Sequence, residues 1–113
     1  WVLQATEASL SKLRAGIAGQ EVHQAAVDVI LGSPYREYVF LSPVGHGVGL
    51  EVHELPRMGL DPGLLEPGMV VTIEPGIYIP DFGGVRIEDI AVVTEDGYEL
   101  LTSFPRDRLM EIG

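Results

Sequence analysis

The chain has 113 residues, the size of one small domain, and its 17 acidic and 7 basic residues give a formal net charge of −10. This charge argues against a nucleic-acid surface and against binding to an anionic membrane, because both partners select basic protein faces. Cysteine is absent, which excludes thiolate metal sites, disulfides and a cysteine nucleophile and fits a cytoplasmic enzyme. No apolar run approaches the roughly 18 residues of a membrane helix.

Apolar residues at helical spacing predict two helices in the first third of the chain. The first prediction covers residues 1 to about 18, with Gly16 and Gly19 as interruptions. The second covers about Gln20 to Leu31, where Val22, Ala25, Ala26, Val29 and Ile30 follow one helical face. The Gly-Ser-Pro sequence at 32–34 ends it.

The rest of the chain predicts strands. The β-branched stretch VVTIEPGIYIP at 70–80 indicates a strand that bends at Pro75–Gly76. Residues 85–94 and 98–102 indicate a hairpin that turns at Asp96–Gly97. Two Pro-Gly steps make residues 60–69 a surface loop. Without a repeat or a linker, one compact unit of helices and strands is the simplest interpretation.

Strand alternation predicts two glutamates at core-like positions. Arg86 and Glu88 share a face that becomes apolar further along, and Glu74 closes the apolar run at 70–74. A buried carboxylate needs a partner. A divalent cation would neutralise both and would accept His46 as a third ligand; such a donor set suits Mn, Fe, Co or Zn. The alternative is a buried Arg86–Glu88 ion pair with Glu74 exposed.

The stretch GHGVGLEVHE at 45–54 holds two of the three histidines. It is not a dinucleotide fingerprint, since Leu50 stands where the last glycine would be, and it is not a zincin helix, since the histidines are seven residues apart. On an extended chain that spacing puts the imidazoles of His46 and His53 on opposite faces unless a bend intervenes. We therefore expect different roles, one histidine binding metal and the other binding substrate.

The remaining candidates are expected to be structural. No G-x-S-x-G elbow supports a serine hydrolase. His23, within the second predicted helix, is expected to be a solvated or capping side chain. Packing side chains are expected at Trp1, Tyr35, Tyr38 and Phe40, and solvated turn residues at Asp61 and Asp81.

Three motifs, GHGVGLEVHELP, LEPGMVVTIEPGIYIP and GGVRIEDIAVVTEDGYELLT, resemble in this order the pita-bread metallopeptidases. The branch most similar to them contains the Xaa-Pro dipeptidases (prolidases) and aminopeptidase P. The resemblance runs from about Tyr38 to the end of the chain. It implies an α+β fold, the C-terminal half of a pita-bread catalytic domain, with two helices followed by a curved, mainly antiparallel sheet. Residues 1–113 would then lack the N-terminal part, which carries two aspartate ligands.

The resemblance also implies a role for each matching residue. His46, Glu74 and Glu88 match metal ligands, and Glu88 matches the one that bridges two divalent metal ions, with manganese expected and cobalt or zinc as alternatives. Glu74 would also move the proton between water and the leaving nitrogen. His53 matches a histidine that contacts substrate and stabilises the tetrahedral intermediate. Arg86 matches an arginine that organises the site beside the bridging glutamate.

The implied activity is metal-dependent hydrolysis of Xaa–Pro bonds in proline-containing di- or oligopeptides, by water activated between the two metals. With three of the five ligands, the isolated chain is expected to be inactive, and the full-length protein is expected to be a homodimer. Ser42 departs from the family, because many Xaa-Pro peptidases have a substrate-binding histidine there. The alternatives are a non-catalytic peptide-binding module of the same fold and a creatinase-like hydrolase of a non-peptide amide.

Overall fold

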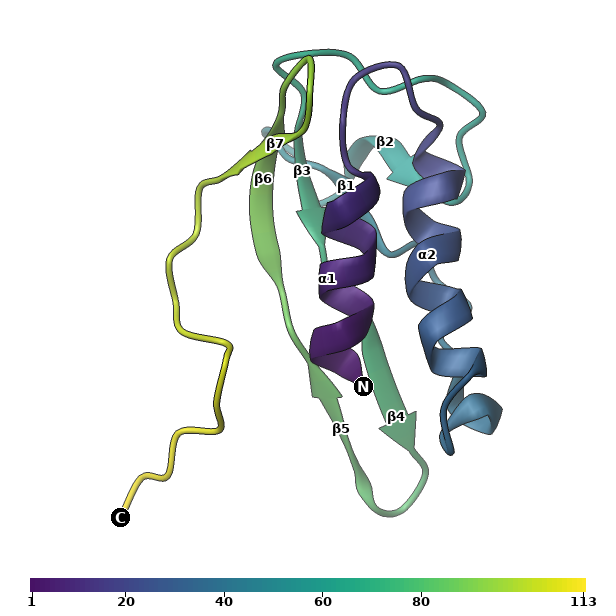
Figure 1. Cartoon of the computed structure of the whole chain (residues 1–113), viewed down its shortest axis with the longest axis vertical. Coiled ribbons are helices and arrows are strands. Elements are labelled where there is room, and N and C mark those ends of the chain that lie inside the picture. Colours follow the sequence, from purple (N-terminus) through teal and green to yellow (C-terminus); the bar gives the residue numbers. More distant parts are fainter.

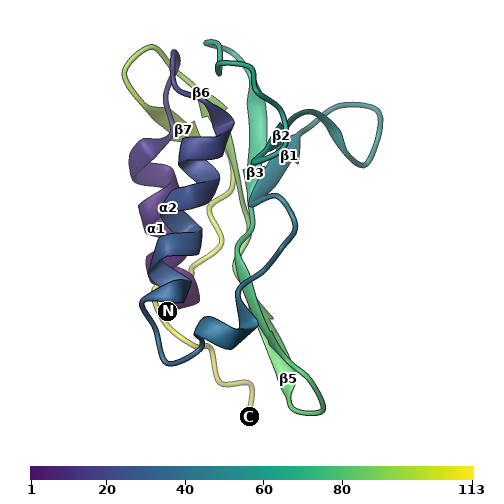
Figure 2. The same ribbon diagram turned by 90° about the vertical axis from the view of Figure 1, so that its right-hand side faces the viewer.

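The computed structural model describes all 113 residues and has two layers, a pair of helices and a curved antiparallel sheet (Figures 1 and 2). Helices α1 (Val2–Lys12) and α2 (Gly19–Leu31) pack against each other and cover one face of the sheet. A short 3₁₀ helix, η1 (Arg36–Tyr38), follows them. The α+β fold class predicted from the sequence is confirmed.

The first helix is shorter than predicted. It ends at Lys12 because Leu13 adopts an extended conformation with ψ of 112°. Gly16 then takes a positive φ of 78°, which suits glycine and prevents the helix from continuing. The second helix agrees with its prediction to within one residue at its start. Neither helix has the length and apolar character that crossing a membrane requires.

Seven strands form two antiparallel sheets. The strands are β1 (Gly45–Gly47), β2 (Glu54–Met58), β3 (Val70–Ile73), β4 (Gly76–Ile79), β5 (Gly83–Arg86), β6 (Asp89–Val93) and β7 (Tyr98–Leu100). The larger sheet has the order β2-β1-β3-β6-β7, and β4 and β5 form the smaller one. The predicted bend at Pro75–Gly76 is confirmed, since it separates β3 from β4.

The two sheets are two ends of one long hairpin, made of β3–β4 and β5–β6 (Figure 1). Its register is the same on both sides of the break: Ile73 pairs with Asp89, and three residues further on Gly76 pairs with Arg86. Pro75 has no N–H to donate to the ladder, and the contact across the break, from Ile87 N–H to the Pro75 carbonyl, is long at 3.4 Å. The prediction of one continuous strand at 85–94 is therefore wrong, because this segment forms two strands, β5 and β6.

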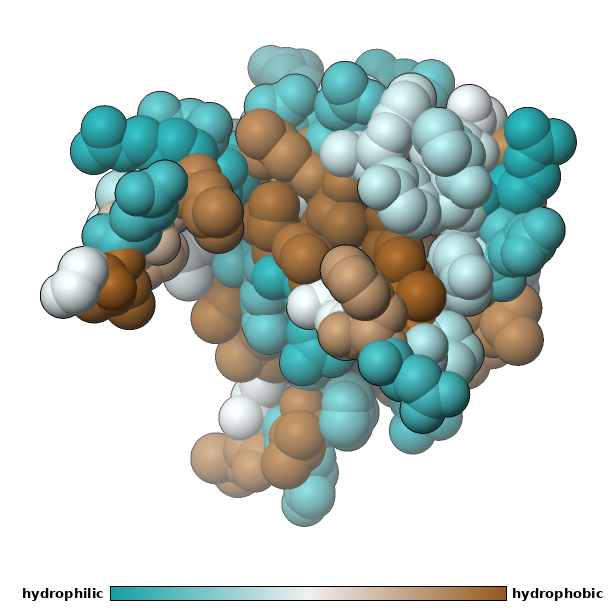
Figure 3. Space-filling model, turned by 90° about the horizontal axis from the view of Figure 1, so that it is seen from below, coloured by the Kyte–Doolittle hydropathy of each residue, from teal (hydrophilic) through white to brown (hydrophobic).

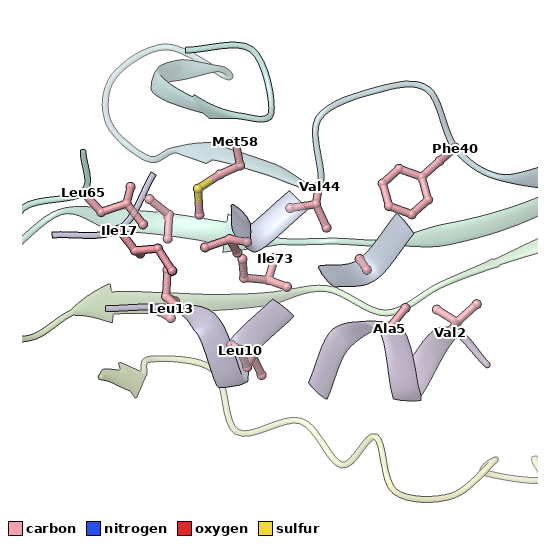
Figure 4. Packing of buried hydrophobic residues seen from close by; sticks show 14 of the residues in the cluster. Val2, Ala5, Leu10, Leu13, Ile17, Phe40, Val44, Met58, Leu65 and Ile73 are labelled. Atoms are coloured by element: carbon pink, nitrogen blue, oxygen red, sulfur yellow. The ribbon is translucent and has the colours of Figure 1, made fainter. Parts of the chain in front are cut away.

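The core lies between the helices and the sheet (Figure 4). The alternating strand residues Val71 and Ile73 of β3, with Ala91 and Val93 of β6, are all at most 1% exposed. They belong to one cluster that also contains Val22, Ala26 and Ile30 of α2, Leu10 of α1 and Met58 of β2. Alternating burial in β6, the nearly continuous burial of β3 and a single apolar face on each helix explain why these segments form these elements.

The aromatic residues predicted to pack divide into two groups. Phe40 is buried and Tyr38 is partly buried against the core, as expected. Trp1 and Tyr35 are 49% and 39% exposed, so their prediction as packing residues is wrong. Both border an apolar cavity of about 570 Å³ beside β4 and β5, on the end of the molecule where apolar surface gathers in Figure 3. Asp81, with φ of 60°, forms the turn between β4 and β5 as predicted.

Candidate active site

Most of the predicted site residues line one cleft of about 430 Å³ at the break in the long hairpin. His46 reaches it from β1, Glu74 from the end of β3 and Arg86 from the end of β5. His53 reaches it from the loop before β2. Glu88 is exposed and is not among the residues that line the cleft.

His46 and Glu74 face each other at the centre of the cleft. The distance from His46 Nε2 to Glu74 Oε1 is 3.1 Å, and both side chains are 16% exposed. His46 Nδ1 lies 2.8 Å from the carbonyl oxygen of Gly47. A carbonyl only accepts hydrogen bonds, so Nδ1 carries a proton and Nε2 is the ring nitrogen that faces Glu74. A proton or a cation between Nε2 and the carboxylate oxygen would join the two groups.

Thr72 fixes the positions of His46 and Glu74 together. The His46 backbone N–H donates to Thr72 Oγ1 at 3.1 Å, and that hydroxyl donates to Glu74 Oε1 at 3.0 Å. The Glu74 N–H donates to the Val44 carbonyl at 2.7 Å. Glycine is required at Gly45, since a Cβ there would overlap the Thr72 carbonyl. The sequence thus brings β1 against β3 closely enough for these bonds to form.

Arg86 pairs with Glu74 on the open side of the cleft. Its Nε lies 3.8 Å from Glu74 Oε2, and its Nη1 lies 3.5 Å from the Tyr78 hydroxyl. The pKa of Arg86 lies above its ordinary value, chiefly because of Tyr78, with smaller contributions from Glu74 and Glu88. The alternative arrangement, a buried Arg86–Glu88 pair beside an exposed Glu74, is wrong, because the Arg86 side chain is 53% exposed and Glu74 is largely buried.

The expectation that His46 and His53 lie on opposite faces of an extended chain is wrong, because the chain bends between them. The β1–β2 ladder shifts register between His46 and Gly47, and the chain then loops out before β2 begins at Glu54. The rings of His46 and His53 lie with their centroids 4.5 Å apart and their planes at 65°. His53 contacts the His46 ring and is itself exposed, so it can reach a bound molecule.

Glu88 lies opposite Glu74 in the register of the hairpin. One step beyond the Ile73–Asp89 pair, antiparallel alternation places Glu74 across from Glu88 on the same face. The side chains do not form a group of three metal-ligating residues. Two carboxylates at directly opposite positions repel each other, and a divalent cation would stabilise both. An imidazole with two carboxylates is a combination of donor types that suits Mn, Fe, Co or Zn.

Sequence reasoning missed three features of the site. Arg57 of β2 and Tyr78 of β4 line the cleft. The alternation of Glu74, Gly76 and Tyr78 along one strand face was the available signal for Tyr78. Arg57 had no such signal, because its position depends on how β2 pairs with β1.

The partial burial of His23 is the third feature. Of the two roles predicted for His23, solvated or capping, the structure shows capping: Val44 N–H donates to its Nδ1 at 3.1 Å. Its ring meets that of Phe40 edge to face with centroids 5.5 Å apart, and burial lowers its pKa. His23 therefore ties α2 to the segment that leads into β1.

Comparison with known proteins identifies the family. The model of metallopeptidase family M24 matches residues 1–95. A relative named Xaa-Pro dipeptidase from Pyrococcus furiosus is 45% identical over 109 residues, which cover 96% of this chain and 31% of the relative. Another Xaa-Pro dipeptidase, from Pyrococcus horikoshii, is 47% identical over 94% of this chain and 30% of its own length.

Solved structures of similar proteins superimpose on most of the chain. The X-Pro aminopeptidase from Thermotoga maritima has a TM-score of 0.88 at 40% identity, covering 94% of this chain and 30% of that one. The prolidase from Pyrococcus furiosus has a TM-score of 0.87 at 45% identity, covering 93% and 31%. The chain thus spans about 30% of the length of these relatives. From its motifs, its fold and these matches, the chain belongs to metallopeptidase family M24, the pita-bread metallopeptidases.

Proposed function

We propose that this chain supplies part of the active site of a metal-dependent peptidase that hydrolyses Xaa–Pro bonds. The observation that carries the proposal is the convergence of His46 Nε2 and Glu74 Oε1 at 3.1 Å, with Glu88 opposite Glu74 in the register. Relatives named Xaa-Pro dipeptidase that are more than 40% identical support the substrate class. Two aspartates from outside residues 1–113 would complete the ligand set of the intact protein.

His46, Glu74 and Glu88 would hold the metals. When bound, two divalent cations, manganese first with cobalt or zinc as alternatives, supply Lewis acidity and lower the pKa of water. The Nδ1–H of His46, held by the Gly47 carbonyl, orients the imidazole as partners of metal-binding histidines usually do. Thr72 orients the Glu74 carboxylate in the same way.

Three residues of this chain act on the substrate or on the proton. Glu74 takes the proton from the attacking water and passes it to the proline nitrogen as the bond breaks. His53 donates to the oxygen that becomes negative, a role worth ~10²–10³ in rate. Arg86, 3.8 Å from Glu74 Oε2, keeps that carboxylate turned into the cleft until it accepts the proton.

The cleft suits a short peptide with a proline ring. Its volume of about 430 Å³ is in the range of small-ligand sites. Phe40 and Tyr78 offer aromatic surface for the ring, and Arg57 offers a cation for a terminal carboxylate in an otherwise acidic chain. These contacts favour an unblocked di- or oligopeptide as the substrate.

Two alternatives each have one supporting observation. Ser42 lines the cleft at the position where many Xaa-Pro peptidases have a histidine, which favours a creatinase-like hydrolase of a non-peptide amide. The lack of a group of three metal-ligating side chains in this chain favours a non-catalytic binding module. That the intact protein is a cytoplasmic homodimer stays a prediction.

The test is hydrolysis by the intact protein after its metals are removed with a chelator and Mn²⁺ is added back. We expect cleavage of Xaa–Pro dipeptides or tripeptides and none of matched Xaa–Ala peptides. Glu74→Gln should lower kcat by about 10³-fold, since general acid–base groups contribute ~10²–10⁴. Glu95→Gln, an exposed glutamate in the β6–β7 turn, is the matched control and should leave kcat unchanged.

The outcomes separate the alternatives. Peptide binding without turnover would support the binding module, and turnover of creatine but of no peptide would support the creatinase-like hydrolase. Either result would overturn the proposed peptidase. The isolated 113-residue chain should be inactive under the same conditions.

A further inference from the structure

The face of β6 that points away from the cleft carries one buried carboxylate, Asp89. It is 2% exposed, and it pairs across the ladder with Ile73, which is fully buried. Ala91, the next residue on the same face, is also fully buried. A carboxylate among such neighbours is unfavourable unless it is paired and hydrogen-bonded. Asp89 is also the residue directly after Glu88, the proposed bridging ligand.

Both partners of the Asp89 carboxylate come from the C-terminal segment, residues 101–113. Thr102 Oγ1 donates to Asp89 Oδ1 at 2.7 Å, and Arg106 Nη1 lies 2.7 Å from Asp89 Oδ2. The latter contact is an ion pair without the alignment of a hydrogen bond, so Arg106 is the only group that neutralises Oδ2. Figure 1 shows this segment leaving β7 and running past β6 and β5. Arg106 therefore holds Asp89 in the core from outside the sheet.

The same segment also fixes the backbone next to Asp89. The Ile90 N–H donates to Thr102 Oγ1 at 3.1 Å, and the Leu101 N–H donates to the Ile90 carbonyl at 2.8 Å. Glu88, by contrast, lies in the break between β5 and β6, outside both ladders. The nearest backbone bond on its other side is the long one from Ile87 N–H to Pro75. The position of Glu88 thus depends mainly on how Asp89 is held.

We propose that Arg106, acting through Asp89, is a positioning residue for the metal ligand Glu88. Successive strand residues point to opposite faces, so an Asp89 side chain held in the core keeps Glu88 on the face of Glu74. If Arg106 is lost, the unpaired carboxylate turns toward water, and the rotation of the strand carries Glu88 away from its partner. This inference rests on the proposed function, because it assigns Glu88 to the metals.

The chain offers a matched control and a conservative rescue. Arg108 is exposed, lies two residues further along the same segment and makes no ion pair. Arg106→Gln removes the cation beside Asp89, Arg108→Gln removes an equal charge from the groove that Arg106 also lines without breaking the Asp89 ion pair, and Arg106→Lys keeps the charge. All three are made in the intact protein, and each is examined well below its melting temperature, so that a folded sample is measured.

Mn²⁺ binding is measured from the free-ion EPR signal during titration of the metal-free protein. Arg106→Gln should weaken Mn²⁺ binding by about tenfold or more, the range seen when the residues that orient metal ligands are removed. Arg108→Gln should stay within about twofold, and Arg106→Lys should recover most of the affinity. At saturating Mn²⁺ the kcat of Arg106→Gln should return toward the wild-type value, which a loss of folding would not allow.

Hydrogen exchange provides a readout that is independent of metal. In Arg106→Gln, amides in the peptide covering residues 86–92 should exchange faster than in the wild type, and in Arg108→Gln they should not. Unchanged exchange, or unchanged Mn²⁺ affinity in a wild-type protein that binds the ion, would overturn the positioning role. A wild-type protein that binds no Mn²⁺ would overturn the proposed function instead, and the exchange result would then decide whether Arg106 orders the segment around Glu88.

Discussion

The two ends of the long hairpin have one register but opposite environments. In the β3–β6 end, Val71 and Ala91 are fully buried beneath the helices. In the β4–β5 end, all four residues of β5 are exposed, and Val85 retains 58% of its surface. Part of the difference comes from the strands themselves, because β3 and β6 consist mostly of β-branched residues whereas β5 has the sequence Gly-Gly-Val-Arg. The rest comes from β1 and β7, which pair with β3 and β6 but not with β4 or β5.

The candidate site lies where these two environments meet. Glu74 follows the last buried residue of β3, so a packed ladder holds its backbone while its side chain faces the cleft. Arg86 and Tyr78 come from the open end and remain accessible to a substrate. A packed end therefore positions Glu74, and an open end supplies the accessible side chains of the cleft.

The largest expected effect tests the difference in burial directly, with the same substitution at both ends. Val71→Ala should lower the free energy of unfolding by about 2 kcal/mol, since it removes two buried carbon atoms and leaves a cavity. Val85→Ala should change it by less than about 0.5 kcal/mol, as exposed substitutions usually do. Urea unfolding measures both. Equal effects at the two positions would show that both ends are equally packed in solution.

A smaller effect is expected at the junction of the two ends. Thr72→Val keeps the side-chain shape but removes the hydroxyl that accepts from the His46 N–H and donates to Glu74. Leaving these partly buried groups without a partner should destabilise the protein by about 1–2 kcal/mol. Thr72→Ser keeps the hydroxyl and should recover most of the loss in the same denaturation experiment. If Thr72→Val were as stable as the wild type, these hydrogen bonds would not hold the junction together.

The smallest effect is the pH dependence of stability that His23 causes. His23 lies in α2 and accepts a hydrogen bond from Val44 N–H. Burial lowers the pKa of His23, so the folded protein favours the neutral imidazole. As the pH falls below about 6.5, the unfolded chain binds a proton that the folded protein does not, and the free energy of unfolding decreases until the folded pKa is passed. Above that pH, His23 makes no pH-dependent contribution.

His23→Asn removes this titration and keeps a polar acceptor near the position of Nδ1. Urea unfolding at pH 7.5 and pH 5.5 should therefore show a smaller decrease in stability for His23→Asn than for the wild type. The acidic residues contribute equally to both proteins and cancel in the comparison. An identical decrease would mean that His23 titrates in the same way in the folded and unfolded states.

Much of the candidate site could be predicted because its residues lie in local motifs. Each signal occupies only a few residues of the sequence. These signals are the glycines around His46, the Pro75–Gly76 break after Glu74, and the alternation of Arg86 and Glu88. The place of Arg57 in the cleft and the partner of His23, the Val44 N–H, could not be predicted in this way. Each depends on a partner more than ten residues away along the chain, and strand pairing decides which partner that is.

Local periodicity and backbone chemistry are enough to predict the α+β class, the second helix and the break at Pro75, because each follows from residues close together in the chain. That Arg86 pairs with Glu74 and that Asp89 is held by Arg106 is visible only in the folded molecule. An ion pair depends on which charged groups are brought together and how far water is excluded from them. Those two conditions are set by the register of the hairpin and by the path of the C-terminal segment, which no stretch of sequence specifies alone.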